Sequence, residues 1–207
     1  MIFKSLTVGP FQCNCIFLGC EATKEAIVID PGDEADRIFE MALQLELNVV
    51  YLAHTHAHLD HIGATATIQK KTGAKTGLHE DDMFLCEKLS VQTAFFGLPP
   101  LPVPDIDQFL KDGATLTFGR ERLNVLHTPG HTPGSVCFHH DQIGLLTGDT
   151  LFAGSVGRTD LWGGSHPMLI QSIKQKLLPF PDETPVLPGH GRGTTIGMER
   201  TRNRFLQ

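Results

Sequence analysis

Side chains able to bind a metal ion are concentrated in residues 54–61, which read HTHAHLDH. Alternate side chains of an extended chain point the same way, so His56 and His58 could hold one ion. Asp60 and His61 fall where a helix is expected to begin, face elsewhere, and could hold a second ion. Four such side chains within six residues have no obvious packing purpose and would be costly to bury without partners. The segment therefore indicates a metal site.

The same arrangement recurs after later expected strands, each of which stops at Gly or Pro before a metal-competent side chain. His131, Asp149 and His190 all occupy such positions. Loops at strand ends on a rigid sheet are common places for open catalytic sites, and Gly or Pro keeps such loops in a fixed geometry. We therefore expect these side chains to converge with those of residues 54–61.

The elements that must position these residues alternate between strand and helix along the chain. Strands are expected over 2–8, 15–19, 25–29, 49–53, 76–79, 115–118, 122–126, 135–139, 143–146 and 185–187, and helices over 34–45, 62–71, 80–93 and 168–178. Residues 97–107, with four Pro, read as a linker that is too short and too central for a domain boundary. The pattern favours stacked sheets covered by helices.

Length and composition narrow the class of protein. The 207 residues favour a single domain, 1–207. A net charge of −6 has the wrong sign for a main affinity for nucleic acid or an anionic membrane. No stretch approaches the roughly 20 apolar residues of a membrane span, and no signal peptide is recognisable, so a cytoplasmic location is expected. The sequence carries no information on oligomeric state.

The remaining His and Cys residues receive simpler interpretations. His54 and His127 are expected to make buried hydrogen bonds beside the site, and the other four are expected at the surface or in turns: His79, His139, His140 and His166. Three of the five Cys, at 13, 15 and 20, lie in an apolar run without a fourth local ligand. We expect them to be small buried side chains, with a thiolate metal site as the alternative.

Taken in order, the motifs resemble those of the metallo-β-lactamase superfamily. They are HxHxDH at 56–61, TPGH ending at His131, GDT around Asp149 and GH ending at His190. The runs GDTLFAG at 148–154 and PGHG at 188–191 resemble the glyoxalase II branch, the hydroxyacylglutathione hydrolases. The resemblance implies an α/β fold, an αββα sandwich of two mixed sheets flanked by helices.

The resemblance also implies two divalent metal ions, with Zn favoured and Fe or Mn compatible with the same donors. The implied ligands form two groups joined by one carboxylate: His56, His58 and His131; Asp60, His61 and His190; and the bridging Asp149. A hydroxide between the ions, acting with the catalytic carboxylates Asp60 and Asp149, would attack a thioester carbonyl. The implied substrate is a small-molecule thioester, S-lactoylglutathione or a related hydroxyacyl thioester.

Two further residues have a functional and a simpler interpretation. Arg158 stands where glyoxalase II typically has a substrate-contacting Lys, and could bind a substrate carboxylate through two hydrogen bonds. A salt bridge to Asp160 is the alternative. Asp30 matches another superfamily motif and would support the ligands from behind, whereas a turn-forming Asp is the alternative.

Other activities remain open at this stage. Glyoxalase II carries a C-terminal helical region, but only 17 residues follow His190, so the thiol carrier is undetermined. A Gly-Arg-Thr-Asp run such as residues 157–160 also occurs in persulfide dioxygenases, which use one iron, whereas PGHG favours the hydrolases. A non-enzymatic metal-binding protein ranks lower, because a buffer gains nothing from seven ligands dispersed over a folded scaffold.

Overall fold

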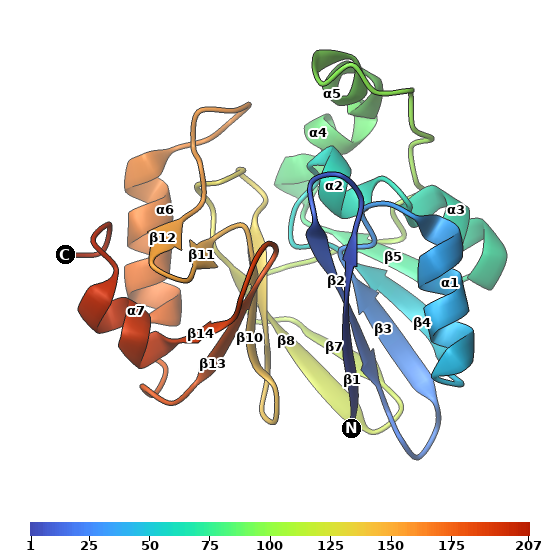
Figure 1. The fold of residues 1–207 in the computed structure, drawn as a ribbon, viewed down its shortest axis with the longest axis horizontal. Helices are drawn as coiled ribbons and strands as arrows, with labels where there is room; N and C mark the ends of the chain where they lie inside the picture. Colours follow the sequence, from blue (N-terminus) through green and yellow to red (C-terminus); the bar gives the residue numbers. More distant parts are fainter.

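Two six-stranded sheets face each other in the computed structural model, which describes residues 1–207 (Figure 1). The first sheet contains, in spatial order, β1 (Ile2–Val8), β2 (Cys13–Gly19), β3 (Glu25–Ile29), β4 (Asn48–Ala53), β5 (Lys75–Leu78) and β6 (Gln108–Phe109). The second contains β14 (Thr194–Thr195), β13 (Pro185–Pro188), β10 (Gly144–Gly148), β9 (Val136–His140), β8 (Glu121–His127) and β7 (Thr115–Phe118). Both sheets are mixed, with β3 to β6 parallel in the first and β10 parallel to β13 in the second. A small hairpin of β11 (Leu151–Phe152) and β12 (Ser155–Val156) forms a separate two-stranded sheet that packs against the second sheet.

Helices cover the outer face of each sheet (Figure 1). The first sheet is covered by α1 (Ala35–Gln44) and α3 (Thr65–Thr72), and the second by α6 (His166–Ser172), the π-helical turn η2 (Ile173–Leu177) and α7 (Ile196–Arg202). Four short helices lie elsewhere in the first half: α2 (Leu59–Ile62), η1 (Glu80–Asp82), α4 (Met83–Glu87) and α5 (Leu89–Phe95). The predicted αββα sandwich is confirmed. None of these helices has both the length and the apolar composition needed to cross a bilayer.

Alternation along β3 shows how one strand serves two apolar layers. Ile27 and Ile29 pack between the two sheets, whereas Ala26 and Val28 pack beneath α1 and α3. Neighbouring side chains of a strand point to opposite faces, so an apolar residue at every position fits a sheet that is covered on both sides. Each fully buried Ile stabilises the fold by roughly 1.5–3 kcal/mol.

Two of the expected helices have other bounds in the structure. The helix expected over 62–71 is α3, which begins at Thr65, and the separate helix α2 ends at Ile62. At Gly63, between them, a Cβ would collide with the Gly32 carbonyl oxygen and would meet Leu101 Cδ1 at 2.9 Å. The helix expected over 80–93 is three short pieces, with a break at Lys88 (φ −102°, ψ 27°). Residues 97–107 contain no helix or strand and lead into the short edge strand β6.

Two of the histidines expected at the surface or in turns lie where strands end in turns but are buried. His79 stacks on His127, with ring centroids 4.0 Å apart and planes only 10° from parallel. His140 accepts a hydrogen bond from the Gln142 backbone N–H through Nδ1. A polar residue in a turn is usually exposed, and the contacts that bury these two rings cannot be recognised from the sequence. All five Cys are buried and unpaired, as expected for small core side chains.

Candidate metal centre

The candidate ligands lie on loops at one edge of each sheet. In the first sheet, His56 and His58 follow β4, and the short helix α2, which begins at Leu59, carries Asp60 and His61. In the second sheet, β8, β10 and β13 run in the same direction, and His131, Asp149 and His190 follow their carboxyl ends. Parallel strands present their carboxyl ends at a common edge, so this topology gathers the loops.

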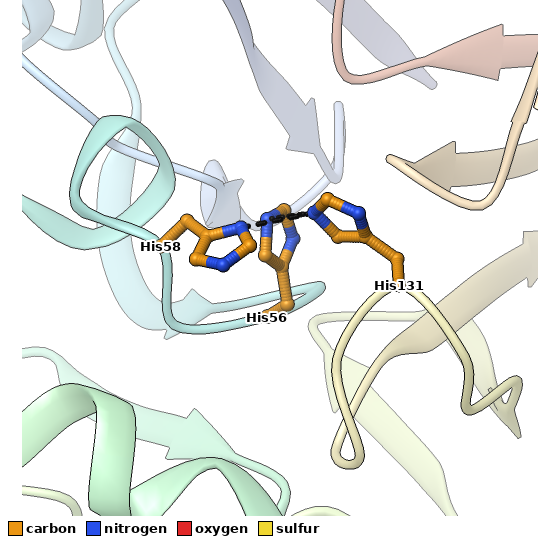
Figure 2. A group of neighbouring side chains, drawn as sticks. All are labelled: His56, His58 and His131. Atoms are coloured by element: carbon orange, nitrogen blue, oxygen red, sulfur yellow. Dashed lines mark hydrogen bonds between the residues drawn. The ribbon is translucent and has the colours of Figure 1, made fainter. Parts of the chain in front are cut away.

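Three imidazoles form the first group (Figure 2). Figure 2 shows His58 and His56 on one loop and His131 on another, with their rings directed toward one another. His131 Nε2 lies 2.9 Å from His58 Nδ1 and 3.2 Å from His56 Nε2. Two nitrogens on a tetrahedral Zn²⁺, each about 2.0–2.1 Å from it, would be about 3.3–3.4 Å apart. The observed spacing is close to that value.

A second group adjoins the first and contains one carboxylate and two imidazoles. His190 Nε2 lies 3.2 Å from both His61 Nε2 and Asp60 Oδ2. His61 Nε2 is 3.7 Å from the same Asp60 oxygen. This mixed nitrogen and oxygen set is suited to Zn²⁺ and to iron or manganese.

Asp149 lies between the two groups and faces both. Its Oδ1 is 3.4 Å from His61 Nε2 and 3.5 Å from His190 Nε2, while Oδ2 is 3.8 Å from His131 Nε2. A Cβ at Gly189 would collide with Asp149 Oδ1, so the glycine leaves room for this carboxylate. One oxygen toward each group is the arrangement that a bridging ligand requires.

The protonation states of His56, His58 and Asp149 fit a bound cation. Burial and the neighbouring imidazoles lower the pKa of His56, and burial lowers that of His58 to about 3, which leaves both neutral with free lone pairs. Burial alone would raise the pKa of Asp149, but the surrounding imidazoles hold it well below its ordinary value. Asp149 Oδ1 and His58 Nε2 are buried without a hydrogen-bond partner. Unpaired buried polar atoms are costly, and a bound cation would satisfy the carboxylate oxygen.

Asp30 combines the two interpretations that its sequence allowed. It adopts a left-handed backbone conformation at the turn after β3, with φ of 52°. Its carboxylate also accepts hydrogen bonds from the Thr55 N–H and hydroxyl, at 2.7 and 2.6 Å, and lies 3.0 Å from His61 Nδ1. With Nδ1 occupied in this way, His61 turns Nε2 toward the candidate centre.

Asp82 is a residue that the sequence did not single out. Its buried carboxylate accepts hydrogen bonds from the backbone N–H of Ala57 at 3.0 Å, the hydroxyl of Thr132 at 2.8 Å and the backbone N–H of Gly134 at 2.7 Å. Ala57 separates His56 from His58, and Thr132 follows His131, so one side chain joins both loops of the first group. The sequence feature that could have pointed to Asp82 is its position shortly after β5. Asp30 and His56 likewise lie shortly after β3 and β4.

Arg158 makes the alternative contact expected from the sequence. Its side chain is 56% exposed and pairs with Asp160 through two hydrogen bonds of 2.7 and 2.9 Å. The backbone oxygen of Arg158 also accepts a hydrogen bond from His131 Nδ1 at 2.8 Å, provided that this nitrogen carries the proton. The residue thus lies beside the first group.

A cavity of about 190 Å³ opens over the candidate ligands. Its outer wall is formed by Arg158 and by apolar and aromatic side chains, of which Phe11, Phe96 and Trp162 are the largest. Its floor includes His58, Asp60, His131, Asp149 and His190. The centre is therefore open to a small molecule from one side.

Comparison with known proteins identifies the family: residues 8–190 match the profile of the metallo-beta-lactamase superfamily, and the chain belongs to this superfamily. It is 41% identical over 214 residues to the hydroxyacylglutathione hydrolase GloC of Haemophilus influenzae, a match covering 100% of this chain and 98% of GloC. The crystal structure of the BLEG-1 B3 metallo-beta-lactamase superposes with a TM-score of 0.92 at 37% identity and full coverage of both chains. Human mitochondrial persulfide dioxygenase ETHE1 is 29% identical, over 95% of this chain and 73% of ETHE1. The relatives' names describe three different reactions.

Proposed function

We propose that the protein is a dinuclear metal-dependent hydrolase of hydroxyacyl thioesters, acting on S-lactoylglutathione or a related compound. The observation that carries this proposal is the position of Asp149, with one carboxylate oxygen toward each of two adjoining ligand groups. The similarity to GloC over the whole chain supports the thioester as the substrate.

The first ion would be held by the three imidazoles of the first group, the second by Asp60, His61 and His190, and Asp149 would contact both. Such ions, with zinc favoured, supply an activated water and polarise the substrate carbonyl. The reaction adds the hydroxyl of water to the acyl carbon and breaks the C–S bond. The electron pair and a proton pass to the sulfur, and no oxidation occurs.

The chain itself contributes orientation and selectivity. Asp30 fixes the ring of His61, and Asp82 fixes the two loops that carry the first group. Arg158 would exchange its exposed partner Asp160 for a carboxylate of the substrate, because a guanidinium binds either carboxylate through two parallel hydrogen bonds.

A mononuclear iron persulfide dioxygenase is the second candidate. The run of residues 157–160 and the 29% identity to ETHE1 favour it. One iron would need only part of the donor set, so this candidate leaves His61 and His190 without a catalytic purpose. The presence of a complete second group therefore ranks the hydrolase first.

A single variant separates the two candidates. We expect wild type to bind about two metal ions per chain, to hydrolyse S-lactoylglutathione and to take up no oxygen with glutathione persulfide. His190→Ala should retain about one ion and lose most thioesterase activity. His166→Ala, at an exposed histidine outside the site, is the matched control and should behave as wild type. Oxygen uptake by wild type, with one ion per chain and an active His190→Ala, would establish the dioxygenase instead.

A further inference from the structure

A second cavity, of about 230 Å³, lies next to the one over the candidate metal centre. The two cavities share Phe11, Leu59 and Asp60 as lining residues. The second extends from there between the β1–β2 turn and residues 98–101, part of the proline-rich segment that the sequence left without a role. A molecule bound at the centre could therefore reach into both cavities.

The two cavities differ in chemistry. The first contains Arg158, whose guanidinium suits a carboxylate. No Lys, Arg or His lines the second, and its walls include the side chains of Val8, Leu59, Leu98 and Leu101. Its acidic residues, Asp33 and Asp60, would repel an anion. The second cavity thus suits an uncharged apolar group.

The aromatic ring of Phe11 stands at the junction of the cavities. It packs edge-on against Phe96, with ring centroids 5.2 Å apart, and lines both spaces. Asp60 also borders both, and it is a candidate ligand of the second ion. A thioester placed at the centre with its thiol moiety toward Arg158 would therefore direct its acyl group past Asp60 into the apolar space.

From this arrangement we infer that the second cavity is an acyl subsite, and that the preferred substrates are thioesters whose acyl group, with or without a hydroxyl, continues into an apolar chain of medium length. This inference rests on the proposed thioester hydrolysis and specifies its substrate class. A cavity of about 150 Å³ holds a benzene ring, so the larger space here accommodates an acyl chain of roughly six to eight carbons. Burying one CH₂ group should raise kcat/KM about threefold to fourfold until the cavity is filled.

The test is a series of acyl thioesters of one thiol, from acetyl to decanoyl. For wild type, we expect kcat/KM to rise about threefold to fourfold per CH₂ and to level off near six to eight carbons. Leu98→Trp places a large side chain in the second cavity without lining the first, and should abolish the preference for hexanoyl over acetyl. Leu98→Ala enlarges the space and should move the optimum to longer chains. Leu43→Trp, at an exposed apolar position on α1, is the control and should keep the wild-type profile.

Binding of hexanoate and acetate, measured by calorimetry, gives a readout that does not depend on turnover. Wild type should bind hexanoate at least tenfold more tightly than acetate, and Leu98→Trp should reduce this ratio toward one. Equal binding of the two acids, or the same ratio in folded Leu98→Trp, would overturn the acyl subsite. If no thioester is hydrolysed but the binding ratio behaves as expected, the proposed function fails while the apolar subsite stands. If Leu98→Trp does not fold, the shift in optimum and in binding with Leu98→Ala decides.

Discussion

Replacement of Asp82 by Ala should weaken both the fold and metal binding. The change leaves the buried N–H groups of Ala57 and Gly134 without their acceptor, whereas the Thr132 hydroxyl keeps Ser135 Oγ at 2.7 Å. Each unsatisfied buried donor costs roughly 1–3 kcal/mol, which gives a loss of about 2–6 kcal/mol for the pair. Burial raises the pKa of Asp82, so removing this carboxylate returns part of its desolvation cost. We therefore expect a loss of about 2–4 kcal/mol, a large share of the roughly 5–15 kcal/mol by which typical domains are stable.

The assay is urea denaturation of the metal-free protein together with chelator competition for the bound ions. In Asp82→Ala the loops of His56 and His131 lose their common anchor, so at least one ion should bind at least tenfold more weakly. Asp82→Asn keeps one acceptor oxygen and should fall between wild type and Ala. Asp141→Ala, at an exposed carboxylate outside the candidate ligand groups, is the control and should leave ion affinity unchanged. An Asp82→Ala protein with wild-type stability and ion affinity would refute the reasoning.

Three further predictions address other parts of the molecule. Asp149→Asn should keep the fold, retain metal poorly and lower turnover by orders of magnitude; two tightly bound ions with full activity would contradict the bridging role. Arg158→Ala should raise KM for carboxylate-bearing thioesters without altering metal content, and an equal loss on uncharged thioesters would indicate a structural role. Burial and the stacked ring of His127 lower the pKa of His79 from 6.5, so the unfolded chain binds this proton more readily and stability falls as pH decreases below 6.5. His79→Gln should therefore show a smaller drop in Tm between pH 7 and pH 5 than wild type, and an unchanged drop in thermal unfolding experiments would disprove this origin.

The parts of the fold predicted from sequence are those that local pattern controls. Strands β1, β3 and β7 have the expected bounds, because their apolar runs end at clear turn residues. The candidate ligands were predicted to meet because residues 54–61 follow one strand, and His131, Asp149 and His190 each follow a later strand that stops at Gly or Pro. The structure brings all seven together. Their roles as ligands stay predictions.

The parts that were missed depend on contacts distant in the chain. Two-residue strands such as β6 and β14 have no pattern of their own and exist through pairing with a neighbour. The need for Gly at position 63 comes from the Gly32 carbonyl and the Leu101 side chain, and the role of Asp82 comes from a loop about 50 residues later. The pairing of Arg158 with Asp160 was the alternative interpretation of Arg158, and it was available because the two residues are only two positions apart in sequence.

The order of the two sheets along the chain has a consequence for biosynthesis. The strands of the first sheet are complete at Phe109, and the second sheet begins at Thr115. A growing chain can therefore assemble the first sheet, with its four candidate ligands, while the other three are still to be made. The loop between β13 and β14, which carries His190, then packs against β2, where the Asn14 N–H donates a hydrogen bond to the Gly189 carbonyl at 2.7 Å. The first ligand group is complete only after His131 has left the ribosome, and the second only after His190. Capture of both ions would therefore mark the end of folding rather than nucleate it.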